Sequence, residues 1–306
     1  MKRDLTYDYD FSAQEIWDIF KLAKELKDKQ KRGQAHQLLA RKSLAMIFQK
    51  PSTRTRVSFE VGMTQLGGHA LYLSSSDLQL SRGETISDVA RVLSRYVDGI
   101  MARVFNQSDI IDLARNASVP VINGLSDEFH PCQILTDFFT ILEQRGNLKN
   151  LTIAFVGDGN NNITNSLILT AARLGINLNI ASPEKYQVKP EIFDLAKSDM
   201  QQTGAVMKTH VDPSQAVQAA EVIYTDCWVS MGRTDTDERI KAFQIYQVNQ
   251  ALVAKAKKGA MVMHCLPAHR GQEITDEVID GPQSIIFDQA ENRLHVQKAI
   301  LVKILQ

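Results

Sequence analysis

The stretch "SLAMIFQKPSTRTRVSFE", residues 43–60, joins a short apolar run to a polar turn and then to a helical pattern. The run Leu44–Phe48 is typical of a strand covered on both faces, because it is short and continuously hydrophobic. Ser52 or Thr53 is expected to cap the helix that follows. The turn is unusual, since three hydroxyls and two arginines fall within residues 52–56. A buried strand that leads through a polar turn into a helix favours an α/β fold.

The polar turn has the chemistry that an anion requires. Backbone N–H groups and the helix dipole favour an anion at a helix N-terminus. Guanidinium groups match phosphate oxygens, and only one of Arg54 and Arg56 needs to face the ligand, because they lie on nearly opposite sides of a helix start. The spacing lacks the G-x-x-x-x-G-K-[ST] pattern, which argues against a nucleoside triphosphatase. We interpret the turn as a phosphate site; the alternative is a solvated cap with surface arginines.

Strand-like and helix-like segments alternate along almost the whole chain. This alternation indicates two open α/β domains with parallel sheets, and we expect them over residues 1–146 and 147–290. Ser12 and Glu15 stand at capping-box spacing before the first helix, and an amphipathic helix over residues 291–306 ends the chain. The expected strands are "SLAMIF", "HALYL", "GIMARV", "PVIN", "LTIAFVG", "INLNIAS", "AVMKTH", "EVIYTD", "AMVMHCL" and "SIIFD".

Composition excludes several classes of protein. The chain has 306 residues, and its 35 Lys and Arg balance its 35 Asp and Glu, whereas nucleic-acid binders usually show a basic excess. Three cysteines without short pair spacing favour a reducing compartment, so we expect a cytoplasmic protein. The first ten residues lack the apolar core of a signal peptide. No apolar run reaches the ~20 residues that a membrane span needs.

Ligands of open α/β sheets bind beyond the carboxyl ends of the strands, and most of the unusual polar residues lie there. In the first half, "HPCQ" places His130 at a helix start with Pro131 in the first turn. The imidazole can polarise a carbonyl oxygen, and Gln133 can hydrogen-bond an amide. Arg103 is a further donor after the strand "GIMA". Taken alone, His130 is more commonly a helix cap.

In the second half, "VGDGNNNITNS" resembles a dinucleotide-binding loop but has Asn162 in place of the third glycine, and the next strand ends without a ribose-binding acid. Asn162 is therefore a candidate contact for a small ligand. Asp226, at the end of another strand, can pair with an ammonium group or cap a turn. Cys265 is either a covalent nucleophile or part of a pocket wall, and we favour the wall. His264, Cys265 and His269 do not match a closed zinc pattern.

The motifs "STRTR", "HPCQ", "DCWVSMG" and "HCLP", in this order and over essentially the whole chain, resemble the aspartate/ornithine carbamoyltransferase superfamily. The last two resemble its ornithine branch. The resemblance implies transfer of the carbamoyl group of carbamoyl phosphate to the δ-amine of L-ornithine, giving citrulline and phosphate. It implies one α/β domain for each substrate, the second Rossmann-like, with helix 291–306 returning to the first. It also implies a homotrimer that uses no metal or organic cofactor.

The resemblance also assigns roles to single residues. Gln79 is expected to act in the site of a neighbouring subunit, and Asn161 is an alternative to Asn162. The expected catalytic residues are Arg103, His130, Asp226 and Cys265. The expected carbamoyl phosphate contacts are Ser52, Thr53, Arg54, Thr55, Gln79, Arg103, His130, Gln133, Cys265, Leu266 and Arg293. The expected ornithine contacts are Asn162, Asp226, Ser230 and Met231.

Three alternatives stay open at this level. A sister transferase could act on putrescine, aspartate or an acylated ornithine, although the "DCWVSMG" loop favours free ornithine. A dinucleotide-dependent oxidoreductase is disfavoured by the missing glycine and the missing acid. A non-catalytic binding protein on the same fold is disfavoured by the complete set of polar residues at strand ends. The sequence leaves open whether the protein serves arginine synthesis or citrulline breakdown.

Overall fold

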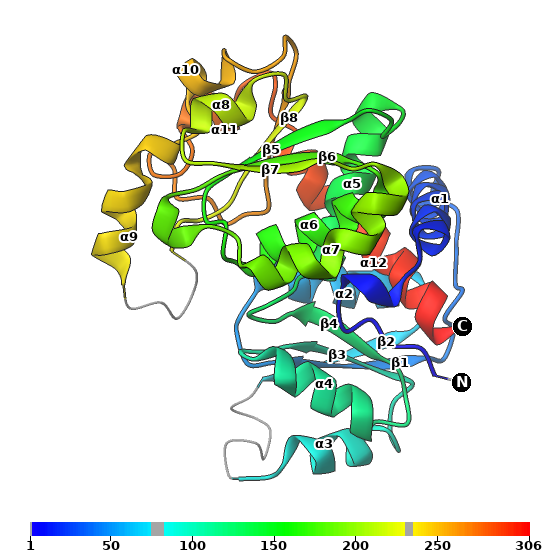
Figure 1. The fold of residues 1–306 in the computed structure, drawn as a ribbon. Coiled ribbons are helices and arrows are strands. Elements are labelled where there is room, and N and C mark those ends of the chain that lie inside the picture. Colours follow the sequence, from blue (N-terminus) through cyan, green and yellow to red (C-terminus); the bar gives the residue numbers. More distant parts are fainter. Residues whose placement is uncertain (1, 75–82, 230–234) are drawn as a thin grey trace. The chain divides into compact units, whose positions relative to one another are not determined.

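The computed structural model describes residues 2–74, 83–229 and 235–306 (Figure 1). The chain divides into two compact units, each with its own parallel sheet. Unit 1 comprises Met1–Phe139 and Glu291–Gln306, and unit 2 comprises Thr140–Ala290. The division falls inside two long helices, α5 (Pro131–Arg145) and α12 (Ile286–Leu305). The expectation of two parallel-sheet α/β domains is confirmed.

Unit 1 has a four-stranded sheet in the order β2-β1-β3-β4, with every neighbouring pair parallel. Its strands are β1 (Ser43–Phe48), β2 (His69–Ser74), β3 (Gly99–Arg103) and β4 (Val121–Leu125). Besides α5 and α12, its helices are the short 3₁₀ helix η1 (Asp8–Asp10), α1 (Ala13–Lys31), α2 (Thr53–Gln65), α3 (Ile86–Leu93) and α4 (Gln107–Asn116). β2 forms one edge of the sheet and is partly exposed, whereas β1 and β3 are largely buried, as their continuous apolar runs predict.

Two helix starts in unit 1 follow the local sequence closely. Ser12 Oγ accepts a hydrogen bond from the Glu15 N–H at 3.3 Å, and the Glu15 carboxylate accepts one from the Ser12 N–H at 3.0 Å, so the predicted capping box is present. Ser52 caps α2, because its Oγ accepts from the Thr55 N–H at 3.3 Å. Ser52, and not Thr53, is therefore the cap of the helix that carries the polar turn.

Unit 2 has a five-stranded parallel sheet in the order β7-β6-β5-β8-β9. Its strands are β5 (Thr152–Val156), β6 (Asn177–Ala181), β7 (Met207–His210), β8 (Val222–Thr225) and β9 (Met261–His264). Its helices are α6 (Asn162–Leu174), η3 (Glu184–Tyr186), α7 (Pro190–Thr203), α8 (Pro213–Val217), α9 (Thr236–Phe243), η4 (Gln244–Tyr246), α10 (Gln250–Val253) and α11 (Asp276–Ile279). Figure 1 shows α6 and α7 running along the sheet side by side.

The expectation of a strand over "SIIFD" is wrong. Ile286 already begins α12, and Ser284 forms only an isolated bridge with Val262. A short apolar run at the start of a buried helix has the same hydrophobic pattern as a buried strand, which explains the error. The terminal helix therefore starts at Ile286, before the expected residue 291.

Helix α12 packs on unit 1, as expected. Lys27 Nζ of α1 donates to Asn292 Oδ1 at 2.7 Å. Lys298 Nζ donates to Gln30 Oε1 and to Gln65 Oε1, both at 2.8 Å, which ties α12 to α1 and to the end of α2. Within residues 2–74, 83–229 and 235–306, no helix combines the length and the apolar character that a bilayer span requires.

Candidate active site

The polar turn of unit 1 follows β1 and leads into the first turn of α2. Thr55 is 1% exposed, while Arg54 is half-buried and lies beside it in the same turn. The helix start therefore combines backbone N–H groups with one half-buried guanidinium. This is the arrangement that binds an anion at a helix N-terminus.

Two further candidate residues of unit 1 lie at the end of a strand and at the start of a helix. Arg103 is the last residue of β3, and His130 directly precedes α5. Both side chains are nearly buried, at 8% and 4% exposure. Burial lowers the pKa of His130 well below 6.5, and the positive charges of Arg293 and Arg103 lower it further. At neutral pH the imidazole is therefore uncharged.

Arg293 of α12 connects the groups that come from α2 and α5. Its Nη1 donates to Gln133 Oε1 at 2.5 Å, and its Nη2 donates to Thr55 Oγ1 at 3.3 Å. The Gln133 amide is occupied at its other end as well, because Nε2 donates to Asp137 Oδ1 at 2.8 Å. The structure thus brings together Thr55, Gln133 and Arg293, which three separate segments of the sequence supply.

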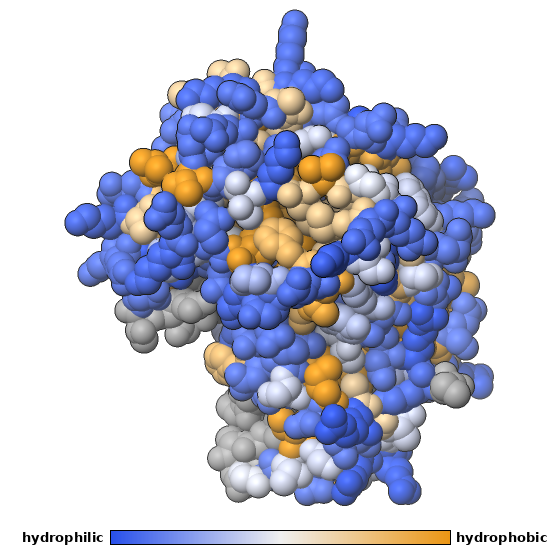
Figure 2. Space-filling model, in the orientation of Figure 1, coloured by the Kyte–Doolittle hydropathy of each residue, from blue (hydrophilic) through white to orange (hydrophobic). Residues whose placement is uncertain are grey.

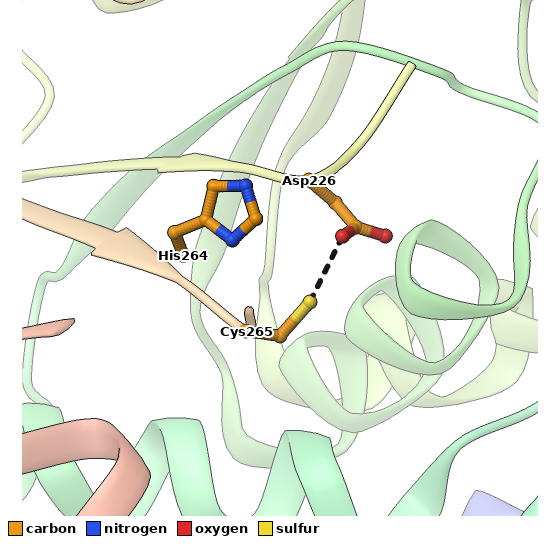
Figure 3. Close-up of side chains that lie close together, drawn as sticks. All are labelled: Asp226, His264 and Cys265. Carbon is orange, nitrogen blue, oxygen red and sulfur yellow. Dashed lines mark hydrogen bonds between the residues drawn. The ribbon is translucent and has the colours of Figure 1, made fainter. Parts of the chain in front are cut away.

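Unit 2 places Asp226 and Cys265 after two neighbouring strands. The parallel register pairs Thr225 of β8 with His264 of β9, so the next residue of each strand lies beside the other. Cys265 Sγ donates to Asp226 Oδ1 at 3.0 Å, and Figure 3 shows the thiol directed at the carboxylate. Asp226 is 8% exposed. The strand-end rule thus accounts for this pair.

A second thiol lies at the same carboxylate. Cys227 Sγ is within hydrogen-bond distance of Asp226 Oδ1 and of the Pro267 carbonyl oxygen, at 3.4 Å each. Burial, and then the charge of Asp226, raise the pKa of the Cys227 thiol, which keeps it protonated. The sequence assigned no role to Cys227, because nothing in its local pattern shows that it shares an acceptor with Cys265.

The ligand atoms of Asp226, His264 and Cys265 lie within 4.8 Å of one another (Figure 3), which is close enough to hold a metal ion. Both nitrogens of His264 already have partners. Nδ1 accepts from the Leu266 N–H at 2.8 Å, so the proton is on Nε2, which donates to Glu273 Oε1 at 3.0 Å. Metal coordination would break one of these bonds in a fully buried pair, so the group does not fit a metal ion.

The glycine-rich turn after β5 is held by a buried ion pair. Arg239 Nη2 contacts the carboxylate of Asp158 with both side chains 2% exposed, and Arg239 Nε donates to the Trp228 carbonyl at 2.7 Å. Beyond the turn, Asn161 caps α6, because its Oδ1 accepts from the Thr164 N–H at 2.8 Å. The buried Asn161 Nδ2 has no hydrogen-bond partner among the described residues.

Not every predicted site residue can be placed. Asn162 is the first residue of α6 and is half-buried. Leu266 follows β9 with a left-handed backbone, φ 59°. Gln79, Ser230 and Met231 lie outside the described residues.

Comparisons with known proteins match the two halves of the chain to two different domain models. Residues 3–143 match the family model "Aspartate/ornithine carbamoyltransferase, carbamoyl-P binding domain". Residues 149–304 match "Aspartate/ornithine carbamoyltransferase, Asp/Orn binding domain". The two matches together span nearly the whole chain. They separate close to the first boundary between the compact units, while the second match also runs through residues 291–304, which belong to unit 1.

Individual relatives match over most of their length. The anabolic ornithine carbamoyltransferase of Pyrococcus furiosus is 55% identical over 304 residues, which cover 99% of this chain and 96% of the relative. The ornithine carbamoyltransferase of Anoxybacillus flavithermus is 54% identical, with 97% and 94% covered. The solved Pyrococcus furiosus ornithine carbamoyltransferase superimposes with a TM-score of 0.96 at 54% identity, with 99% and 97% covered. This chain belongs to the aspartate/ornithine carbamoyltransferase family.

Proposed function

We propose that this protein is an ornithine carbamoyltransferase. It transfers the carbamoyl group of carbamoyl phosphate to the δ-amine of L-ornithine and releases citrulline and phosphate. Relatives at 54–55% identity over nearly the whole chain carry the name ornithine carbamoyltransferase, and the two units match the carbamoyl phosphate and amino-acid domains of the family. The new C–N bond forms as the bond between the carbamoyl carbon and the phosphate oxygen breaks.

The observation that carries this proposal is the group formed by Arg103, His130 and Arg293 in unit 1. Burial, and then the positive charges of Arg293 and Arg103, hold the pKa of the His130 imidazole well below 6.5, so the site is positive around a neutral hydrogen-bonding ring. Negative charge grows on the carbonyl oxygen when an amine attacks the carbamoyl carbon. Arg103, His130 and Thr55 donate to that oxygen, and a preorganised donor of this kind lowers a barrier by about 3–4 kcal/mol.

The phosphate end is bound at the start of α2. Ser52 and Thr53 supply hydroxyl donors, Thr55 supplies a backbone donor, and Arg54 supplies a half-buried guanidinium that matches the phosphate oxygens. The helix dipole favours the departing phosphate. Gln133 and Leu266 contact the amide of the carbamoyl group, and Arg293 orders this end of the site.

Unit 2 binds the amino acid. Asp226 and Cys265 hold the amine and help to remove the proton that it loses after attack, and Cys265 acts as a neutral thiol. Asn161 or Asn162, with Ser230 and Met231, contacts the rest of ornithine. The unpaired Nδ2 of Asn161 supports Asn161 as a donor to the substrate.

The test is an amine panel. The purified protein is incubated with carbamoyl phosphate and, separately, with L-ornithine, N-acetyl-L-ornithine, putrescine or L-aspartate, and the carbamoylated products are quantified. We expect citrulline from ornithine at a rate at least a hundredfold above that with each other amine. A preference for putrescine or aspartate would assign the protein to a sister activity, and no product with any amine would contradict carbamoyl transfer.

We further infer that the protein forms a homotrimer in which Gln79 of one subunit completes the site of its neighbour. Exposed hydrophobic residues are scattered over the face shown in Figure 2, as on most proteins. Val57 and Val61, however, are both exposed and lie one turn apart on α2, which packs against the edge strand β2 with its exposed Leu71. An exposed apolar helix face beside an open sheet edge supports contact with a second copy of the chain.

Mixed oligomers test this assembly. Gln79→Ala and Arg54→Ala proteins should each be impaired. When the two are unfolded together and reassembled, a Gln79→Ala subunit keeps its own Arg54 and receives Gln79 from its neighbour, which restores one complete site. Recovered activity well above that of both parents supports the shared site, and hybrids no more active than the mean of the parents would contradict it. Sedimentation of the parent protein reports the trimer independently.

Two predictions from the sequence are also proposals, and the metabolic direction, which the sequence leaves open, is a third. The domain bounds are residues 1–146 and 147–290, with residues 291–306 returning to the first. The cysteine usage supports a cytoplasmic location. The name of one relative contains the word "anabolic", which supports a role in arginine synthesis.

A further inference from the structure

Helix α12 presents two neighbouring polar side chains to the interior of unit 1. Arg293 and Gln297 are four residues apart, so they share one face of the helix, and they are 4% and 0% exposed. We assign the amide orientation of Gln297 from its neighbours, with the oxygen toward Arg293 and the nitrogen toward Ser58, because the opposite orientation would place the oxygen against acceptors only and the nitrogen against donors only. In this orientation Gln297 Oε1 accepts from Arg293 Nη2 at 2.9 Å and from Arg293 Nε at 3.0 Å.

The other end of the Gln297 amide connects to the start of α2. Gln297 Nε2 donates to Ser58 Oγ. Ser58 Oγ in turn donates to the Arg54 carbonyl at 2.6 Å and lies 3.2 Å from the Thr55 carbonyl. The hydroxyl is thus used as both donor and acceptor. The backbone of the phosphate turn is therefore connected to the Arg293 guanidinium through two buried neutral side chains.

The guanidinium is held from two sides. Gln297 occupies the Nε edge, while Nη1 and Nη2 reach Gln133 and Thr55. Arginine has several rotatable bonds, and fixing such a side chain costs conformational entropy that well-placed acceptors must offset. A neutral acceptor fixes the geometry without cancelling the positive charge, which a carboxylate at this position would do.

We propose that Gln297 is a positioning residue that sets the orientation of Arg293 and, through it, the placement of Thr55 and Gln133 at the carbamoyl end of carbamoyl phosphate. This inference rests on the proposed function. Gln297 does not touch the substrate in this account. It acts on the carbamoyl end, because Arg293 contacts Gln133 and the Thr55 hydroxyl, which are assigned to that end. Arg54, the backbone of the turn and the cap of α2 hold the phosphate.

The experiment measures the binding of two ligands by calorimetry. One is inorganic phosphate, and the other is a phosphonate analogue of carbamoyl phosphate that keeps the carbamoyl amide but lacks the labile bond. Their affinity ratio isolates the contribution of the carbamoyl end. Gln297→Met keeps the length of the side chain but removes the acceptor, and it should lower the ratio about tenfold, the effect of losing ~1.4 kcal/mol. Binding of phosphate itself should change less than twofold.

Gln297→Glu is the conservative variant. It keeps the acceptor for Arg293, so the affinity ratio should stay within about twofold of the parent, even though its negative charge weakens both ligands. Lys298→Met is the matched control on the same helix. It removes hydrogen bonds to Gln30 and Gln65 but makes no contact with Arg293, so it should lower stability and leave the ratio unchanged.

Several outcomes would overturn the inference. An unchanged affinity ratio in Gln297→Met would overturn it. A fall of the affinity ratio in Lys298→Met equal to that in Gln297→Met would also overturn it, because it would indicate general loosening of the helix. If Gln297→Met does not fold, Gln297→Glu decides, because a tenfold fall of its ratio contradicts the proposal and a retained ratio supports it. A parent protein that binds neither ligand and forms no citrulline contradicts the proposed function itself, which is a distinct result.

Discussion

Replacing Asp226 by asparagine is the perturbation that best isolates the amine site. The carboxylate is 8% exposed, and its Oδ1 accepts from Cys265 Sγ at 3.0 Å. Asparagine keeps the shape of the side chain and one oxygen acceptor, but it removes the charge. The variant therefore should fold normally and fail mainly in its interaction with a basic amine.

The size of the effect follows from the lost charge. A buried hydrogen bond to a charged group contributes about 1.5–3 kcal/mol, and 1.4 kcal/mol is a factor of ten. We therefore expect kcat/KM for ornithine to fall by a factor of about 10–150. Binding of carbamoyl phosphate should change less than about twofold, because its proposed phosphate contacts lie in unit 1 and keep their charges.

The assay compares steady-state citrulline formation at saturating carbamoyl phosphate with calorimetric binding of the phosphonate analogue. Asp280→Asn is the matched control, since it removes the same charge from unit 2 where Asp280 pairs with the exposed Arg270. This control should leave both quantities near the parent values. Equal losses of ornithine turnover and analogue binding in Asp226→Asn would refute the reasoning, as would a loss below about threefold in ornithine turnover.

Further predictions concern the phosphate turn, the buried ion pair and the acid limit of stability. Arg54→Ala should raise the KM for carbamoyl phosphate at least about tenfold at saturating ornithine, and a near-parent value would count against its phosphate role. Arg239→Leu should lower the free energy of unfolding in urea by about 3–5 kcal/mol, because the buried Asp158 carboxylate loses the guanidinium that balances its charge; a loss below ~1 kcal/mol contradicts this. Burial and the Lys298 charge lower the pKa of His295 from 6.5 to about 4, so the unfolded chain binds a proton in this window that the folded chain does not, and stability falls as pH drops from 6.5 to 4. His295→Gln should flatten that slope in urea titrations, and an unchanged slope would show that other groups cause it.

The fold class could be predicted from the sequence because its signals are local. Leu44–Phe48 is apolar without interruption, and the structure buries it inside a parallel sheet. Ser12 and Glu15 form the capping box that their spacing predicts. The wrong strand prediction over residues 284–288 also comes from a local signal. Ile285 and Ile286 fit a strand and a helix start equally well, and only packing decides between them.

The candidate site could be predicted where residues stand at strand ends. Arg103 ends a strand, Asp226 and Cys265 follow strands, and His130 precedes a helix, so a topological rule points to them. Arg293 has no such signal. It lies in the middle of a helix far along the chain from Gln133, and only the family resemblance pointed to it before the structure placed the two side chains 2.5 Å apart.

The supporting residues were missed for a different reason. Asp137 and Gln297 stand four residues after Gln133 and Arg293 in helices, so their spacing was available as a signal. The burial of Asp137 and Gln297 could not be predicted from the sequence, because it depends on how distant segments pack. Glu273 likewise lies in an irregular segment, and nothing local shows that its carboxylate is fully buried against His264.

The central claim is that a new bond forms between the carbamoyl carbon and the δ-nitrogen of ornithine. Nuclear magnetic resonance tests this directly when the protein is supplied with ¹³C-carbamoyl phosphate and ornithine labelled with ¹⁵N at the δ-position. The account predicts a product whose carbamoyl carbon shows one-bond coupling to the labelled nitrogen, with phosphate released in equal amount. A carbamoyl carbon that appears only as bicarbonate, or a product without that coupling, would contradict it.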